Sequence, residues 1–157
     1  MDDRIARRLR SAGIDLLPQA PPRHPYEVAT RDGDTLYVSG KTAMRDGAVV
    51  YAGSLAGAGD ISRGQEAARL CTIQLLSALD AVVGLECVDR VLKLTVFVAS
   101  ASEFTGQALV ANAASELLRK ALGDAGTHAR SAVGVAALPG GSTVEVEAVV
   151  RVRAEAA

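Results

Sequence analysis

The last part of the chain contains the pattern that most restricts the fold, a strict alternation of apolar and other residues. Every second residue over 144–152 is Val or Ala, which is the period of a strand with one buried face. Residues 130–138 also have the composition of a strand, and Gly140-Gly141 between the two segments suits a tight turn with positive φ. We therefore predict an antiparallel hairpin over residues 130–152.

In that hairpin Ala136 lies opposite Glu145, and one face of the sheet combines small residues with three charges. An exposed sheet face ordinarily has bulky polar or β-branched side chains, so the small residues leave room for a ligand. Arg130 and Glu145 would lie about 20 Å apart along the ladder. Both could contact one small molecule only if the site lay between subunits. The residues of this face are Arg130, Ala132, Gly134, Ala136, Glu145 and Glu147.

The composition excludes several classes of function. A chain of 157 residues suits one domain, and a net charge of −1 gives no general attraction to nucleic acid. With two Phe, three Tyr and no Trp, aromatic platforms for stacking bases are scarce. No apolar run reaches the length of a membrane span and no secretory signal is recognisable, so we expect a cytoplasmic protein with no membrane or nucleic-acid partner. Cys71 and Cys87 fit free thiols in a reducing compartment.

Helix and strand patterns alternate along the rest of the chain. Residues 62–83 have an apolar stripe at helical spacing, and Ser62 with Gln65 predicts a capping box at the start of that helix. A strand is predicted over 89–99 and a second long helix over 104–122. We predict one α+β domain with a mostly antiparallel or mixed sheet and both long helices on one face. The other predicted elements are a helix over 2–13 and strands over 27–31, 35–39 and 49–51.

The predicted strand over 89–99 also indicates how the sheet is covered. Its alternation separates one wholly apolar face from a second, mixed face that the two helices cannot reach. Burial of the second face against sister subunits in a cyclic assembly is the simplest solution. The predicted helix-facing residues are Leu92, Leu94, Val96 and Val98, and the predicted residues of the second face are Val91, Lys93, Thr95 and Phe97.

Five ordered motifs, together with the predicted helix over 62–83 between the second and the third, give the chain a resemblance to one known family. They are Pro25-Tyr26, Leu36–Gly40, Val91–Val98, Asn112-Ala113 and the segment from Arg130 to Ala148. On these motifs the chain resembles the RidA/YjgF family, small trimeric proteins with a chorismate mutase-like fold. The segment 128–135 and the additional N-terminal helix are similar to a longer bacterial branch. The resemblance implies a RidA-like domain over 26–153, with a helix and Pro-rich connector over 1–25 and a short tail over 154–157.

The resemblance also implies a reaction and the residues that perform it. Many members hydrolyse reactive 2-imino or enamino acids to 2-oxo acids and ammonia, without a metal or an organic cofactor. By motif position, Arg130 binds the substrate carboxylate, and Glu145 positions or protonates around the attacking water. The backbone amide of Gly40 donates to the substrate, while Tyr26 and Asn112 line the pocket. The implied partners are a small carboxylated substrate and the other copies of a homotrimer, with sites between subunits.

Two positions depart from the family pattern. Lys41 follows Ser39-Gly40 where the family commonly has Gln. A cation at the pocket rim would favour a dianionic substrate, although a solvated Lys is the simpler interpretation. Ala132 stands where the family often has Cys, so we expect no thiol chemistry at that point.

Each site residue also has an ordinary structural interpretation. Those interpretations are a solvated charge for Arg130, ion pairs of Glu145 and Glu147 with Arg151 and Arg153, a core aromatic for Tyr26 and an exposed helix residue for Asn112. His24 and His128 lack further ligands at metal spacing, so no zinc site is expected. The functional alternatives are a non-catalytic module that binds 2-oxo or related carboxylic acids, a specialised deaminase of a pathway intermediate, and a ribonuclease.

Overall fold

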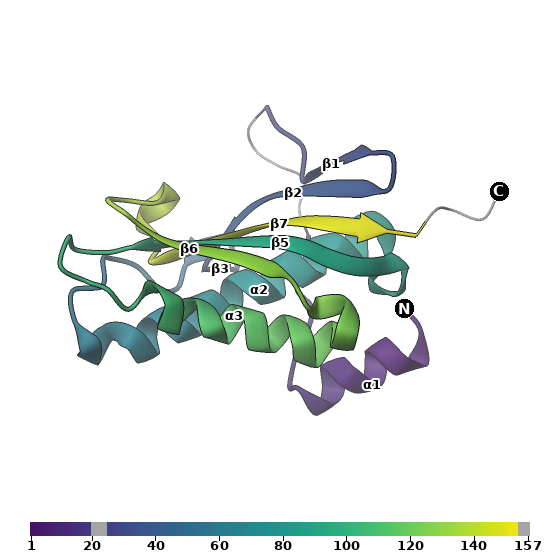
Figure 1. The fold of residues 1–157 in the computed structure, drawn as a ribbon, viewed down its shortest axis with the longest axis horizontal. Coiled ribbons are helices and arrows are strands. Elements are labelled where there is room, and N and C mark those ends of the chain that lie inside the picture. Colours follow the sequence, from purple (N-terminus) through teal and green to yellow (C-terminus); the bar gives the residue numbers. More distant parts are fainter. Residues whose placement is uncertain (20–24, 154–157) are drawn as a thin grey trace.

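A five-stranded mixed sheet in the order β1-β2-β7-β5-β6 organises the computed structural model of the chain, which describes residues 1–19 and 25–153 (Figure 1). Neighbouring strands are antiparallel, except that β5 and β6 are parallel. The helices are α1 (Asp3–Ser11), α2 (Ile61–Val83) and α3 (Gln107–Leu122). The strands are β1 (Ala29–Asp32), β2 (Thr35–Thr42), β3 (Met44–Arg45), β4 (Ala48–Val49), β5 (Val88–Ala99), β6 (Ala129–Val135) and β7 (Val144–Val152), with β3 and β4 forming a separate hairpin.

The two long helices cover one face of the sheet, as predicted (Figure 1). In β7 the residues at even-numbered positions are buried toward the helices, which confirms the predicted alternation over 144–152. Gly84 and Gly123 follow α2 and α3 with positive φ, the backbone conformation that ends a helix at low cost for glycine. The helix-free face of the sheet is lined by side chains at the odd-numbered positions of β7 and their neighbours.

The predicted hairpin over 130–152 is wrong. Strand β5 lies between β6 and β7, pairing in parallel with β6 and antiparallel with β7. The order β5, α3, β6 is the strand–helix–strand unit that a parallel pair requires. Alternation specifies which residues of a strand face the core, but it does not specify the neighbouring strand. Residues 136–143 therefore connect β6 to β7 past β5, and Ala136 does not lie opposite Glu145.

A bulge changes the faces of β5 near its start. The pairing with β7 shifts register between Val91 and Lys93, so one extra residue, Leu92, enters the strand. Val91 is consequently fully buried beside the helices, whereas Leu92 is only partly buried. The predicted faces of Val91 and Leu92 are therefore wrong, because the bulge shifts the alternation at this point. The predicted faces of residues 93–98 are confirmed.

The predicted capping box at the start of α2 is absent. The helix begins at Ile61, and Ser62 lies inside its first turn. The Asp60 carboxylate accepts hydrogen bonds from the amides of Ala56 and Gly57 at 2.7 and 3.3 Å, and it pairs with Arg63 at 3.2 Å. Gln65, the other half of the predicted box, donates instead to the Leu109 carbonyl of α3 at 3.0 Å.

The N-terminal helix α1 lies against α3 on the side away from the sheet (Figure 1). Asp2 caps it by accepting from the Ile5 amide at 2.8 Å, and Ile5 and Leu9 enter the same hydrophobic core as the long helices. The part of residues 1–25 that the structure describes thus packs on the rest of the chain. The Pro-rich part of the connector at 20–22, His24 and the tail over 154–157 lie outside the described residues.

Gly126, in the turn between α3 and β6, is a position where backbone segments meet closely. A Cβ at this residue would collide with the backbone carbonyl of Leu118, which cannot move without unwinding α3. We expect Gly126→Ala to lower the free energy of unfolding by about 1–3 kcal/mol, measured by urea denaturation. Gly59→Ala is the matched control, because a Cβ there meets no atom within 4 Å. Equal stability of the two variants would contradict the close approach.

Candidate active site

Arg130 lies on the outer strand of the sheet and points its guanidinium onto α3. Nη1 donates to Asn112 Oδ1 and to Ser115 Oγ, both at 3.0 Å, and Nη2 donates to the Ala108 carbonyl at 3.4 Å. These bonds use three of the five N–H groups of the guanidinium. Among the described residues, no bond is made by Nε–H or by the second N–H of Nη2. The free edge is the pair of donors that binds a carboxylate in a bidentate manner.

A short relay behind Arg130 fixes its orientation. Ser115 Oγ, which accepts from Arg130, lies 2.9 Å from His128 Nε2, and His128 Nδ1 lies 2.7 Å from the Gly126 carbonyl. The chain of bonds is consistent when Nδ1 carries the proton and Nε2 accepts from the serine hydroxyl. Burial lowers the pKa of His128, and the positive charge of Arg130 lowers it further, which favours this neutral form.

Glu145 lies on the opposite, helix-free face of the sheet. Its backbone pairs with Phe97 of β5 and Thr42 of β2, and its half-buried carboxylate lies over Gly40. A Cβ at position 40 would collide with that carboxylate, so any larger residue there would displace the Glu145 side chain from its present position. Burial raises the pKa of Glu145, and the negative charge of Glu147 raises it further. A carboxyl group with a raised pKa takes up a proton more readily than an ordinary one, which suits a role in proton transfer.

The predicted ion pairs of the two glutamates with Arg151 and Arg153 do not occur among the described residues. Arg151 pairs with Asp89 at 2.6 Å instead. Glu147 pairs with Thr95 of β5, and Lys93, two residues before Thr95, donates to Ser131 Oγ at 2.7 Å instead of pairing with a glutamate. The carboxyl group of Glu145 on the helix-free face therefore has no ion-pair partner among the described residues, although its pKa is raised. A half-buried carboxyl group of this kind is a candidate for a functional site.

Gly40 and Tyr26 lie at the same end of the sheet, because the residues next to each of them are hydrogen-bonded to one another. Ser39, beside Gly40, donates from Oγ to the Glu27 carbonyl at 2.6 Å, and its amide donates to the Val28 carbonyl at 3.0 Å. These bonds hold the residues after Tyr26 against β2. The Tyr26 side chain is 53% exposed, so the interpretation as a core aromatic is wrong. A break in the pairing of β2 and β7 leaves the residues at 39 and 40 out of the regular ladder.

Lys41 is neither a freely solvated cation nor a surface charge pair. Its backbone pairs with Val146, and burial lowers the pKa of its ammonium group. No side-chain hydrogen bond or ion pair of Lys41 occurs within residues 1–19 and 25–153.

The structure brings Arg130 together with Asn112 but separates both from Glu145 and Gly40. Arg130 is level with Leu94 of β5 and faces the helices, whereas Glu145 is level with Phe97 and faces away from them. Two strand spacings of about 4.8 Å and three residues of about 3.3 Å place the two backbones about 14 Å apart. The predicted shared face is therefore wrong. One small molecule cannot contact both side chains of one chain, because the sheet itself lies between them.

Sequence reasoning missed Ser115 and the role of His128 behind Arg130. The spacing of Asn112 and Ser115 by three residues places both on one face of α3, which is the signal that could have grouped them. That signal becomes informative only once β6 is known to lie beside α3. In the part of the chain that the structure describes, no group of three or more His, Cys, Asp or Glu side chains is arranged to hold a metal ion. No helix among the described residues is long and apolar enough to cross a membrane.

The acidity of Glu145 provides a test of this geometry. We expect Glu147→Gln to lower the pKa of Glu145, because the substitution removes the second cause of its elevation and leaves only burial. The pKa is measured from the ¹³C chemical shift of the Glu145 carboxyl carbon as a function of pH. Glu116→Gln, on the exposed surface of α3, is the control and should leave the Glu145 titration unchanged. An unchanged pKa in Glu147→Gln would show that the two carboxylates are further apart than the pairing implies.

The sheet with two long helices on one face defines an α+β protein of the kind found in several solved bacterial structures. The Agrobacterium tumefaciens protein Atu1372, of unknown function, is 38% identical with a TM-score of 0.84, covering 94% of this chain and 91% of that one. A Shewanella oneidensis protein whose name proposes endoribonuclease activity is 26% identical with a TM-score of 0.87, covering 94% and 99%. Among curated sequences, Protein TCP17 of Trypanosoma cruzi is 43% identical over 149 residues, covering 94% of this chain and 93% of that protein.

A family model described as Endoribonuclease L-PSP matches residues 17–152. The chain belongs to this family, which is the RidA/YjgF family of the sequence resemblance. The α+β architecture and the two helices on one face, expected from that resemblance, are thereby confirmed.

Proposed function

We propose that this protein is a hydrolase that deaminates reactive 2-imino and enamino acids to 2-oxo acids and ammonia. The observation that carries the proposal is the Arg130 guanidinium, which α3 holds with three N–H groups and leaves with a free bidentate edge. A fixed fork of this kind recognises a planar carboxylate at one orientation. The substrates of the proposed reaction all have a carboxylate beside the reacting carbon.

The chemistry requires one water and one proton-transferring group. Water attacks the imine carbon, its oxygen forms a bond to that carbon, and the C=N electron pair moves to nitrogen, which takes a proton. Loss of ammonia from the resulting carbinolamine leaves the 2-oxo acid. Glu145 would relay these protons, since burial raises its pKa above the ordinary carboxyl value and so eases its protonation. A positioned acid–base group contributes about 10²–10⁴ in rate, a gain that suits a reaction that already proceeds in water.

We further propose that the site is formed between copies of the chain in a cytoplasmic homotrimer. Arg130 lies on β6, one of the two edge strands of the sheet, and Glu145 lies on the helix-free face. A head-to-tail contact that sets the edge of one copy against the free face of the next would unite the two groups, and with a rotation of one third of a turn such a contact closes into a trimeric ring. The helix-free face also has Tyr37 half exposed and Val133 41% exposed, apolar surface that a neighbouring copy would bury. In this assembly Gly40 and Tyr26 would accompany Glu145, and Asn112 would accompany Arg130.

The direct test is the appearance of 2-oxo acid from freshly generated 2-imino acids of alanine, leucine and phenylalanine, compared with the uncatalysed rate. Acceleration by the purified protein supports the proposal. Absence of acceleration with all three, together with saturable binding of 2-oxo acids, would instead favour a binding module or a specialised deaminase. The family name also points to ribonuclease activity. A parallel incubation with single-stranded RNA tests it, and the loss of any cleavage in an Arg130→Ala preparation would assign that activity to the same site.

A further inference from the structure

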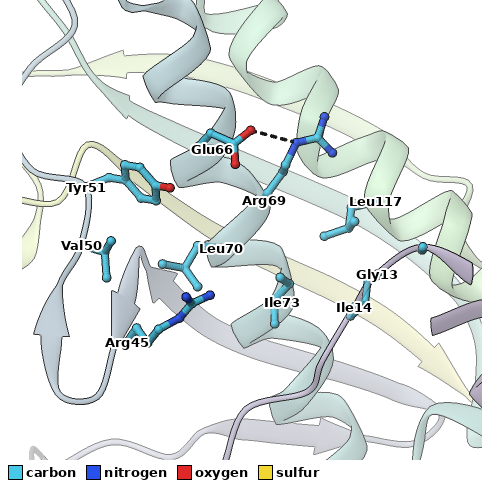
Figure 2. A pocket seen from close by; sticks show the side chains of 11 residues that line it. Gly13, Ile14, Arg45, Val50, Tyr51, Glu66, Arg69, Leu70, Ile73 and Leu117 are labelled. Carbon is cyan, nitrogen blue, oxygen red and sulfur yellow. Dashed lines mark ion pairs between the residues drawn. The ribbon is translucent and has the colours of Figure 1, made fainter. Parts of the chain in front are cut away.

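A hollow on the far side of the helices from the sheet lies apart from both polar clusters. It has a volume of about 240 Å³ and is formed where α2 meets the end of α1 and the β3–β4 hairpin (Figure 2). Neither Arg130 nor Glu145 lines it. Pockets of about 300–1,000 Å³ bind drug-sized ligands, so this hollow suits a smaller molecule.

The inner wall of the hollow is apolar. Leu70 and Ile73 of α2 and Leu117 of α3 form its floor, and Val50 after β4 forms part of the opposite rim (Figure 2). Val50 is 48% exposed, although its neighbours in the wall are mostly buried. An apolar side chain left open beside a buried apolar floor is suited to cover the body of a small apolar ligand.

The rim of the hollow has a net positive charge. Arg45 of β3 extends toward α2 and makes no side-chain hydrogen bond or ion pair with any described residue (Figure 2). Arg69 pairs with Glu66 through Nε and Oε1 at 3.6 Å, with the side chains 35% and 56% exposed. Exposed pairs of this geometry contribute little, so the Arg69 guanidinium can turn to another anion at small cost. Two arginines and one glutamate leave one unbalanced positive charge.

The hollow depends on the N-terminal extension of the chain. Gly13 and Ile14, which follow α1, form one of its walls, and Gly13 makes the turn there with a φ of +64°. These residues precede position 17, where the match to the family model begins. The wall supplied by the N-terminal segment therefore lies outside the matched range, whereas the lining residues from Arg45 to Leu117 lie within it.

We propose that this hollow binds a small organic monoanion, a carboxylate on an apolar body. The carboxylate would accept from the Arg45 guanidinium, and the apolar body would cover Leu70 and Ile73. Arg69, at the other end of the hollow, would add a longer-range attraction (Figure 2). Glu66 at the same rim would repel a second negative charge, so a monoanion is favoured over a dianion. The site goes beyond the proposed deaminase reaction and does not depend on it.

Benzoate and hexanoate are the probes, with benzamide as the uncharged control. Amide chemical shifts of the ¹⁵N-labelled full chain, followed during titration, distinguish this site from the one at Arg130. Saturable shifts are expected at Gly13, Tyr51 and Ile73 with both carboxylates, and at least tenfold weaker binding is expected for benzamide. Shifts confined to the region of Gly134 and Ala132 would place binding at Arg130 alone and overturn the proposal.

Three variants test the site, and their expected effects on benzoate affinity are a decrease, an increase and no change. Arg45→Gln should weaken benzoate binding at least tenfold, because it removes a charge-assisted bond and the unbalanced charge. Glu66→Gln should strengthen binding, since it frees Arg69 and removes the repulsion. Arg7→Gln, an exposed arginine of α1 that does not line the hollow, should leave the affinity unchanged. Equal affinities of Arg45→Gln and Arg7→Gln, or weaker binding by Glu66→Gln, would reject the site.

Discussion

Arg130→Ala is expected to lower kcat/KM for 2-imino acids by about 10²–10⁴-fold, the loss of two charge-assisted hydrogen bonds of about 1.5–3 kcal/mol each. The free Nε and Nη2 edge of the guanidinium is the group that would hold the substrate carboxylate, and alanine offers no donor in its place. The measurement is the rate of 2-oxo acid appearance at substrate concentrations below KM. Stability should change little, because two of the three bonds of Arg130 to α3 are exposed.

Two further substitutions distinguish the bidentate geometry of the Arg130 guanidinium from its positive charge. Arg130→Lys retains a cation but cannot bind a carboxylate with two parallel bonds, so its activity should fall between those of the wild type and Arg130→Ala. Arg119→Ala removes an exposed arginine of α3, the helix that Arg130 contacts. Arg119 makes no bond to Arg130, so this variant should retain wild-type activity. Full activity of Arg130→Ala would exclude Arg130 from substrate binding.

The parts of the fold that local periodicity determines could be predicted from the sequence. The alternation over 144–152 identified the buried side of β7, and the stripe in residues 62–83 with Gly84 identified α2. Burial of apolar side chains on one side of each element follows from these patterns directly. They also indicated that both long helices cover one face, since each has one apolar side.

The neighbours of each strand could not be obtained in the same way. Residues 130–138 and 144–152 are close in sequence and both have strand character, yet β5 lies between them. The pairing depends on where α3 carries the chain, because α3 returns it parallel to β5. The bulge at Leu92 and the start of α2 at Ile61 were likewise missed, since both are decided by contacts with distant segments.

The candidate site shows the same division. Motif positions selected Arg130 and Asn112, and the structure places them in direct contact. The predicted common face of Arg130 and Glu145 failed because it rested on the hairpin. The conclusion that one chain cannot unite the two groups remains, for the different reason that they lie on opposite faces. The partner residues Ser115 and His128 required knowledge of the α3–β6 contact.

A site shared between copies makes a prediction that a site within one chain cannot make. Arg130→Ala and Glu145→Gln should each be nearly inactive alone, and their co-expression should restore activity. If each site takes Arg130 from one copy and Glu145 from the next, random ring assembly gives about one quarter of the sites both natural residues. Glu145→Gln should fold normally at neutral pH, because burial disfavours the charged form of Glu145 that the substitution removes.

The measurement is kcat per chain of the co-expressed mixture, with hetero-oligomers demonstrated by native mass spectrometry. Co-expression of Arg130→Ala with the double variant Arg130→Ala/Glu145→Gln is the control, and it should remain inactive because no copy supplies Arg130. Activity of the first mixture near one quarter of the wild type would show that the edge of one sheet and the free face of another form the site together. Hetero-oligomers without recovered activity would mean that Arg130 and Glu145 do not act on one substrate. In that case Arg130 and Glu145, whose backbones lie about 14 Å apart across the sheet, would act independently of each other.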